Sequence, residues 1–268
     1  MFSPYYAWAR QKGPADPLNH CAVNVALYGR GGRWAMTERR RGAVRQAVHS
    51  LSIGPSALHW DGASLTIDID ETTVPFPSRL RGKVRLHAEG LTPRGFALDG
   101  PGLHHWWPVS PRARIEVDLK QPRLSWQGDG YFDSNFGEVP LERSFKSWHW
   151  SRASLSQGAA VLYETQPLEG APLSLALRFD GKGGVQPFEP PPLARLPGTL
   201  WRIGRETRAD GGKAKVLKTL EDTPFYARSM LATSLLGEKV PAMHESLSLT
   251  RFDTPLVRMM LPFRMPRW

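Results

Sequence analysis

The chain has 268 residues, and its 35 Lys and Arg against 25 Asp and Glu give a formal net charge of +10. Hydrophobic residues make up 41% of it, including ten Trp and eleven Phe. This composition excludes intrinsic disorder, because so much apolar surface can offset the entropy lost on folding. The length allows one large domain or two of about 130 residues each.

The positive charge predicts an anionic partner or anionic surroundings. The basic residues are scattered apart from the run Arg39-Arg40-Arg41, and no nucleic-acid-binding signature accompanies them. We therefore expect no nucleic-acid partner, whereas a membrane surface with anionic lipids fits the charge. The single cysteine, Cys21, excludes an internal disulfide and suits a reducing compartment such as the cytoplasm.

Membrane contact is expected to be peripheral. No apolar run approaches the roughly 20 residues of a spanning helix, and Met1–Tyr6 lacks the pattern of a signal peptide. Residues 256–268 mix apolar side chains with Arg, which suits a lipid interface. A final core strand with a frayed tail is the alternative for this segment.

From the N-terminus, the first recognisable element is Gly29-Arg30-Gly31-Gly32. It lacks the spacing of a dinucleotide-binding loop and is expected to be a hairpin turn. One helix is expected over residues 38–50, where Thr37 can cap the start. The apolar residues of this segment recur at the spacing of one helical face: Ala43, Val44, Ala47, Val48 and Leu51.

The rest of the chain predicts antiparallel β-structure. Apolar residues alternate with other residues, as in half-buried strands, at 65–69, 84–88, 115–119 and 173–179. Turn sequences such as Asp61-Gly62 separate them, at the spacing of a sandwich or barrel. The fold class is therefore expected to be all-β.

Two segments with proline interrupt this pattern. Gln186–Pro192 is expected to be a surface loop rather than a strand, because proline supplies no amide donor to a sheet. Near the midpoint, Lys120–Pro122 ends one strand and precedes a segment rich in Trp and Gly. This boundary predicts an N-terminal domain over 1–122 and a C-terminal domain over 123–268.

The sequence lacks the motifs of common cofactor enzymes and hydrolases. No Walker sequence or Gly-x-Ser-x-Gly elbow occurs, and His244-Glu245 does not continue into a zinc-protease motif. Carboxylates, histidines and aromatic residues remain, and these can perform acid catalysis without a cofactor or metal.

Carboxylates, histidines and aromatic residues are most frequent in two segments, residues 103–108 and 128–137. These segments lie on either side of the strand expected at 115–119. If both are extended, alternation places Tyr131 and Asp133 on one face and His104 and Trp106 on another. An acid, a phenol, an imidazole and an indole could then converge. The residues alone leave open that the aromatic side chains are core and the polar ones close turns.

Several segments, spread nearly from end to end, carry a resemblance to a known family: Phe2–Tyr6, Asn19–Gly29, Arg33–Arg39, Gly130–Gly137, His244–Leu247 and Leu261–Met265. Together they resemble the carotenoid 1,2-hydratases, the hydroxyneurosporene synthase type of phototrophic bacteria. The resemblance implies two lipocalin-like antiparallel halves. It also implies a cofactor-independent hydro-lyase that adds water to the terminal C1=C2 bond of acyclic carotenoids such as neurosporene and lycopene. Such an enzyme is expected in the cytoplasm, on the surface of the intracytoplasmic membrane.

The family's functional pairs, a His and a Trp two apart and a Tyr and an Asp two apart, fall on His104, Trp106, Tyr131 and Asp133. His105 and Trp107 share the spacing of the first pair. We expect Asp133 to protonate the double bond, with a pKa raised by burial, and His104 to donate a hydrogen bond to it. Trp106 and Tyr131 are expected to face the resulting carbocation, and Tyr131 or Asn135 to hold the water. Substrate contacts are expected from Trp107, Asn135, Trp148 and Trp150.

Two other functions stay open at this point. A lipocalin-like carrier of a carotenoid or lipid would need no acid beside the reactive end of its ligand. A glycosidase using Asp133 and Glu142 would need both carboxylates in one polar cleft.

Overall fold

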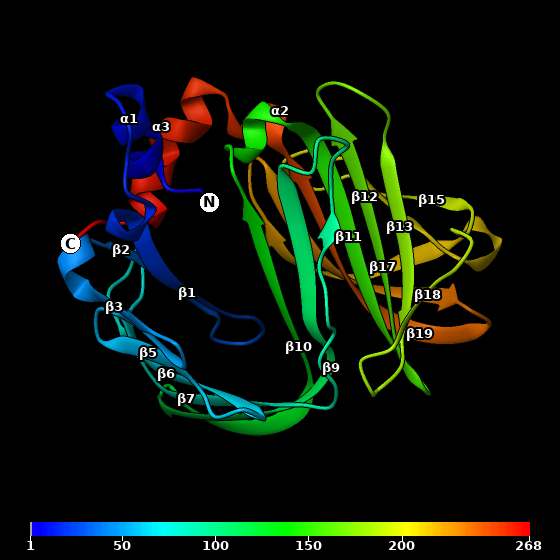
Figure 1. Ribbon diagram of the computed structural model, residues 1–268, viewed down its shortest axis with the longest axis horizontal. Helices are drawn as coiled ribbons and strands as arrows, with labels where there is room; N and C mark the ends of the chain where they lie inside the picture. Colours follow the sequence, from blue (N-terminus) through cyan, green and yellow to red (C-terminus); the bar gives the residue numbers. More distant parts are fainter. Residues whose placement is uncertain (1) are drawn as a thin grey trace. The chain divides into compact units, whose positions relative to one another are not determined.

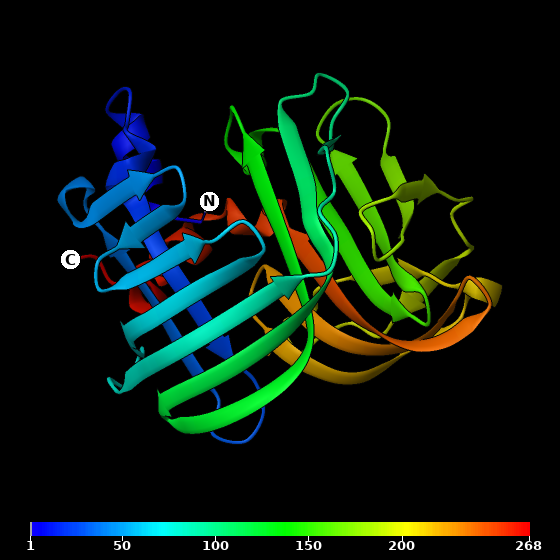
Figure 2. The same ribbon diagram turned by 60° about the horizontal axis from the view of Figure 1, so that its bottom comes forward.

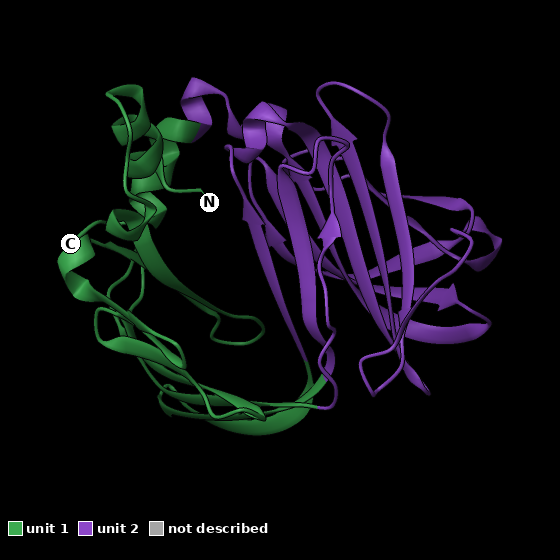
Figure 3. Ribbon diagram, viewed as in Figure 1, with its two compact units in different colours: residues 1–88, 113–130, 258–268 green, residues 89–112, 131–257 purple. Residues whose placement is uncertain are grey.

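The computed structural model describes residues 2–268, which fold mainly into antiparallel strands (Figures 1 and 2). The chain divides into two compact units (Figure 3). Unit 1 comprises residues up to 88 together with 113–130 and 258–268, and unit 2 comprises residues 89–112 and 131–257.

These units differ from the consecutive domains predicted from the sequence. Pro122 does not mark a boundary, because it connects two strands within the 113–130 segment of unit 1. The two strands, β9 (His104–Gln121) and β10 (Arg123–Gly137), are long enough to contribute residues to both units. Proline interrupts the strand pattern here because it cannot donate to the ladder, so the interruption indicated a turn.

Unit 1 contains a two-stranded sheet and most of a larger one. The small sheet pairs β1 (Cys21–Leu27) with β2 (Arg33–Arg39), and the turn predicted at Gly29–Gly32 lies between them. The larger sheet has the order β10-β9-β7-β6-β5-β4-β3. Its remaining strands are β3 (Val44–Ala47), β4 (Ser50–Ile53), β5 (Ser56–Trp60), β6 (Ser64–Thr72) and β7 (Arg79–Ala88). Short helical elements are α1 (Pro4–Gln11), η1 (Pro17–His20) and η2 (Arg41–Ala43).

The predicted alternation in β6, β7 and β9 produces the core of unit 1. Its buried cluster consists of Ala35, Ile69, Leu80, Val117 and Leu119. Beside it the fully buried Glu38 accepts hydrogen bonds from Ser3 and Arg267 and contacts Nδ1 of His20 at 2.8 Å. This network ties the N-terminal and C-terminal segments of unit 1 to β2.

The helix predicted over 38–50 is wrong. The segment forms the end of β2, the turn η2, β3 and the start of β4, and β3 pairs with β4. Of the expected apolar face, only Val44 is buried, while Val48 is 92% exposed. The β-branched Val44 and Val48 and the interrupting Gly42 favour a hairpin over a helix.

Unit 2 is built on a seven-stranded antiparallel sheet with the order β14-β13-β12-β11-β19-β18-β17. Its strands are β11 (Phe145–Leu155), β12 (Gly158–Pro167), β13 (Leu173–Phe179), β14 (Val185–Pro187), β17 (Ala214–Asp222), β18 (Tyr226–Leu235) and β19 (Glu238–Ser248). A hairpin pairs β15 (Leu193–Leu196) with β16 (Arg205–Arg208), and β8 (Phe96–Ala97) pairs with β9. The short helices are η3 (Leu141–Arg143), η4 (Asp210–Gly212), α2 (Leu249–Phe252) and α3 (Pro255–Arg264), the last ending in unit 1.

The loop predicted at Gln186–Pro192 needs one correction. Its first two residues belong to the three-residue strand β14, which pairs with β13 at the edge of the sheet. Pro187 is tolerated there because an edge strand leaves one side without ladder partners. The remaining residues, 188–192, form the expected loop.

The register of the central strands defines two faces of the seven-stranded sheet. Directly opposed residues in antiparallel strands share a face. Trp150 is opposed by Tyr163 on β12 and Glu245 on β19, and we call this side the aromatic face. The neighbouring His149 is opposed by Glu164 and Ser246, and we call this side the histidine face.

A buried apolar core of unit 2 lies on the histidine face, where β15 packs against the sheet. It consists of Ala153, Leu155, Ala160, Leu162, Ala176, Leu196, Leu231, Leu235 and Ala242. The aromatic face carries the chemistry described next.

Candidate active site

Three of the four predicted catalytic residues meet in unit 2. Trp106 on β9 is fully buried, and its Nε1 donates to Oδ2 of Asp133 at 2.9 Å and to the hydroxyl of Tyr131 at 3.0 Å. The Tyr131 hydroxyl in turn donates to the same Oδ2 at 3.0 Å. Two N–H or O–H donors therefore converge on a single carboxyl oxygen.

Two features of β10 produce this convergence. Strand alternation places Tyr131 and Asp133 on the same face, and small residues let β10 lie close to β9. A Cβ added to Gly130 would lie 2.4 Å from Cγ2 of Ile115, and one added to Gly137 would lie 2.6 Å from Cδ2 of His104. Glycines on both sides of the Tyr-x-Asp pair thus permit the short contacts.

The surroundings change the acidity of both groups. Burial raises the pKa of the Asp133 carboxyl, and the negative charge of Glu245 raises it further, against hydrogen bonds from Trp106, Tyr131 and Asn135 that lower it. Burial, reinforced by the charge of Asp133, holds the pKa of Tyr131 well above its ordinary value. Tyr131 therefore stays a hydrogen-bond donor at neutral pH.

His104 does not have the expected role. Its Nε2 donates to the carbonyl of Val139 at 3.0 Å, and its Nδ1 contacts Oδ2 of Asp99 at 2.8 Å. Both ring nitrogens are thereby used, so the prediction that His104 donates a hydrogen bond to Asp133 is wrong. The buried imidazole instead fixes the start of β9 to the segment after β10, and its hydrogen bonds lower the pKa of Asp99 although burial acts in the opposite direction.

The aromatic rings of Trp106 and Tyr131 are also placed differently from expectation. The Trp106 ring is enclosed by other rings, with centroid distances of 5.8 Å to Phe96 and 5.5 Å to Tyr163. Tyr131 lies 5.2 Å from the Trp150 ring and carries the guanidinium of Arg152 at 5.5 Å over its own ring. A fully buried Trp106 cannot face a substrate cation, and one face of Tyr131 is already occupied by a cation.

Of the four residues predicted to contact the substrate, two lie at the Tyr131 and Asp133 pair and two have other partners. Asn135 hydrogen-bonds to Asp133, and Trp150 contacts Tyr131. Trp148 is buried against Phe145 and Tyr163, with ring centroids 6.2 Å and 6.1 Å away. The Nε1 of Trp107 donates to the carbonyl of Thr92, as strand alternation turns Trp107 away from Trp106.

The two His-x-Trp pairs differ in where their side chains lie. His105 stacks on Phe136 at 5.2 Å, and its neighbour Trp107 is bound to Thr92, so neither is placed beside the Tyr131 and Asp133 pair. Of the residues in these two pairs, Trp106 is the one that donates to the Asp133 carboxyl. The earlier pair therefore supplies the site residue, through its tryptophan.

Sequence reasoning missed a second carboxylate on the aromatic face. Glu245 on β19 accepts a hydrogen bond from Nη2 of Arg228 on β18 at 2.6 Å. These residues lie about a hundred positions after Asp133, and no short motif links them to it. The available signal was the alternation of Tyr226 and Arg228 on β18 with the buried small residues Ala227 and Ser229.

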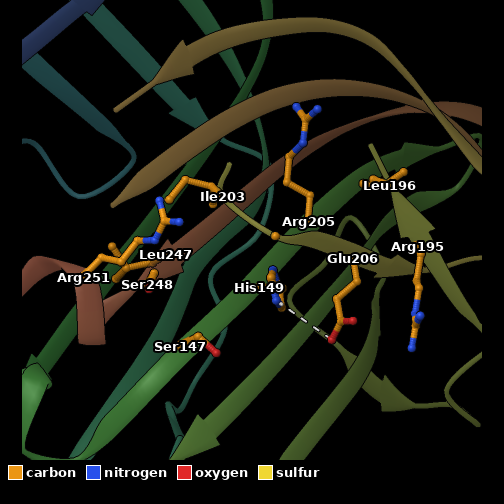
Figure 4. Close-up of a pocket in the computed structure, with 11 residues that line it drawn as sticks. Ser147, His149, Arg195, Leu196, Ile203, Arg205, Glu206, Leu247, Ser248 and Arg251 are labelled. Carbon is orange, nitrogen blue, oxygen red and sulfur yellow. Dashed lines mark ion pairs between the residues drawn. The ribbon is translucent and has the colours of Figure 1, made fainter. Parts of the chain in front are cut away.

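A separate polar cavity of about 420 Å³ lies on the histidine face. Figure 4 shows His149 and Glu206 pointing toward one another there, with Nε2 and Oε1 3.9 Å apart. Arg205 and Arg251, which also line it, donate to backbone carbonyls such as those of Pro197 and Trp201. The cavity is therefore distinct from the Asp133 cluster, on the other side of the sheet.

The described part of the chain, residues 2–268, contains no group of three or more His, Cys, Asp or Glu arranged to hold a metal ion. Over the same residues, none of the helices combines the length and apolarity of a membrane span.

Comparison with known proteins finds carotenoid hydratases, both as a family model and as individual relatives. The family model described as carotenoid hydratase CrtC matches residues 1–268. An acyclic carotenoid 1,2-hydratase of Thiocapsa roseopersicina is 56% identical over 270 residues, covering 100% of this chain and 67% of that protein. An enzyme of the same name from Cereibacter sphaeroides is 41% identical, covering 100% of this chain and 95% of its own length.

Solved structures support the fold class. A crystal structure assigned to AttH of Nitrosomonas europaea matches with a TM-score of 0.55 at 12% identity, covering 84% of this chain and 80% of that one. At this identity the likeness concerns the fold alone, and it confirms the predicted all-β, lipocalin-like class. With the family model matching its whole length, the chain belongs to the carotenoid hydratase CrtC family.

Proposed function

We propose that this carotenoid hydratase adds water across the terminal C1=C2 bond of an acyclic carotenoid, with Asp133 as the proton donor. Family membership supports the reaction. The observation that carries the residue assignment is the convergence of Trp106 and Tyr131 on Oδ2 of Asp133. A carrier protein would not require a buried acid held in this way.

The hydrogen bonds indicate which oxygen delivers the proton. An isolated alkene is a weak base, so the acid must be protonated and shielded from bulk water. Oδ2 of Asp133 accepts from both donors, which leaves Oδ1 to carry the acidic proton. Transfer of that proton to C2 breaks the π bond and leaves a tertiary cation at C1, to which water then adds.

Trp106 and Tyr131 would act on the acid rather than on the substrate. When Asp133 gives up its proton, negative charge develops on the carboxyl, and hydrogen bonds to a charged acceptor are stronger than those to a neutral one. Donors already in place need no reorganisation during the reaction. The Trp106 and Tyr131 donors therefore favour the transition state over the resting acid.

The reaction is tested by incubating the purified protein with lycopene in detergent and water labelled with heavy oxygen, without added cofactor. The expected product contains one labelled hydroxyl at C1, detected by mass spectrometry. Tight binding of lycopene with no change in its mass would support the carrier function instead.

We further propose that the enzyme works at the cytoplasmic surface of a membrane that contains its substrate. Four apolar side chains near the C-terminus are largely exposed, namely Leu256, Met259, Phe263 and Trp268 at 64%, 63%, 76% and 76%. Arg258 and Arg264 are interspersed with them, and the whole chain carries a charge of +10. Exposed apolar groups beside arginines fit an interface with anionic lipids.

Vesicle flotation tests this association. We expect the protein to float with anionic vesicles at low salt and less at high salt, since salt screens exposed charges. Met259→Glu combined with Phe263→Glu should weaken flotation, whereas Phe76→Glu, at an equally exposed phenylalanine in unit 1, should not. Equal failure to float with neutral and anionic vesicles at every salt concentration would contradict the proposal.

A further inference from the structure

A second acidic group lies on the same face as the proton donor. Glu245 is the direct register partner of Trp150 on the neighbouring strand. The Trp150 ring lies 5.2 Å from the Tyr131 ring, whose hydroxyl is 3.0 Å from Oδ2 of Asp133. The two carboxyl groups thus belong to one continuous cluster within unit 2.

Glu245 is paired with an arginine on the neighbouring strand. Its Oε1 forms an ion pair with Nη2 of Arg228 at 2.6 Å. Arg228 is oriented by its Nε, which donates to the Tyr226 hydroxyl at 2.9 Å. The ion pair engages Oε1 of Glu245, and a carboxylate has two oxygens, each able to accept hydrogen bonds.

A hydrogen-bond donor beside Glu245 is left without a protein partner. Nε1 of Trp150 is buried and donates to none of residues 2–268, although the whole residue is only 8% exposed. Buried polar groups are nearly always hydrogen-bonded, so an orphaned indole N–H beside a carboxylate indicates a binding position for a small polar molecule. Tyr131 and Asn135, the earlier candidates for this role, are already bonded to Asp133.

We propose that Trp150 and Glu245 bind the water that captures the C1 cation, and that Glu245 removes its proton. This inference rests on the proposed function. The water oxygen forms the C1–O bond, one of its O–H bonds breaks, and that proton passes to the Glu245 carboxylate. Return of the proton to Asp133 through solvent restores both groups, so the net change is one water added and no redox partner is needed.

The negative charge of Glu245 has a second effect in this arrangement. A carboxylate beside the site stabilises a developing carbocation electrostatically. It also raises the pKa of Asp133, which favours the protonated form that the first step requires. One residue thus supports both halves of the reaction.

The test compares Glu245 with a matched ion pair. Glu164 on the histidine face pairs with Nε of Arg208 at the same 2.6 Å and with similar burial. We expect Glu245→Gln and Glu245→Ala to lower the hydration rate at least ~100-fold, the lower end for a positioned acid or base, while Glu164→Gln stays near the parent rate. Trp150→Phe, which removes the N–H and keeps an aromatic ring at this position, should lower kcat about tenfold with little change in KM.

Chemical rescue distinguishes a catalytic role of Glu245 as a base from a role in which it only forms a structural ion pair. Formate should restore activity to the folded Glu245→Ala protein in a concentration-dependent way, because a small carboxylate can take the vacated place. Near-parent activity in both Glu245 variants, or a folded and inactive Glu245→Ala protein that formate does not rescue, would overturn the inference. A parent protein that hydrates no lycopene would overturn the proposed function itself, which is a different outcome.

Discussion

Replacing Asp133 with Asn is expected to lower the hydration rate at least ~100-fold, the smaller end of what a positioned general acid contributes. Asn has nearly the same size as Asp, and its amide oxygen can still accept from Trp106 and Tyr131, so the fold should be retained. It has no proton acidic enough to transfer to an alkene. The rate with lycopene, measured alongside circular dichroism, separates lost chemistry from lost folding.

Glu142→Gln is the control for this prediction. Glu142 lies in η3 (Leu141–Arg143), outside the strands that carry Asp133 and Glu245. We expect this variant to keep near-parent activity. If folded Asp133→Asn protein hydrates lycopene at the parent rate while Glu142→Gln is inactive, the acid has been assigned to the wrong carboxylate.

The raised pKa of Asp133 also sets the direction of the pH dependence. Only the protonated carboxyl can donate, so the rate should fall as pH rises through the folded-state pKa, which lies above the ordinary value. The same shift means that folding favours the protonated form. The contribution of Asp133 to stability is therefore present below the unfolded pKa of about 3.9 and is lost as pH rises through the folded one.

Replacing Trp106 with Phe is expected to lower the hydration rate as well, by less than the change at Asp133. The change removes the indole N–H that donates to both Asp133 and Tyr131, but it keeps an aromatic ring to pack against Phe96 and Tyr163. Loss of a buried hydrogen bond of this kind costs ~1–3 kcal/mol, so the rate should fall roughly tenfold to a hundredfold. The measurement is kcat as a function of pH.

The direction of the pH shift distinguishes this effect from general damage. The hydrogen bond from Trp106 lowers the pKa of Asp133, so its removal should move the fall in activity to higher pH. Trp34→Phe is the matched control, because the Trp34 N–H donates to the carbonyl of Arg264 in unit 1. A Trp106→Phe profile that coincides with that of Trp34→Phe would contradict the role assigned to the indole.

Most of the strands could be predicted from the sequence, because alternation of apolar residues is a local property. The segments at 65–69, 84–88, 115–119 and 173–179 all lie in strands. The prediction of a helix over 38–50 was wrong because the pairing of β3 with β4 outweighs a weak local helical pattern. The interleaved units could not be predicted, since they depend on how far β9 and β10 extend.

The candidate site, like the fold, could be predicted from the sequence only in part. Tyr131 and Asp133 share a face by alternation alone, and Trp106 reaches them because β9 and β10 are neighbours. The partners of His104 could not be anticipated, because Asp99 and Val139 lie in loops. Glu245 was missed because its position beside Trp150 depends on the register of β11 and β19, which no local pattern specifies.

Burial of the Asp133 carboxyl raises its pKa, and we propose that this shift makes its proton available for the reaction. Carbon NMR of protein labelled at the aspartate carboxyl carbons tests this directly, with the Asp133 signal assigned from the Asp133→Asn variant. We expect Asp133 to titrate above the ordinary aspartate value and at the same pH at which lycopene hydration falls. An Asp133 signal that titrates at or below the ordinary value, while hydration proceeds unchanged at higher pH, would contradict it.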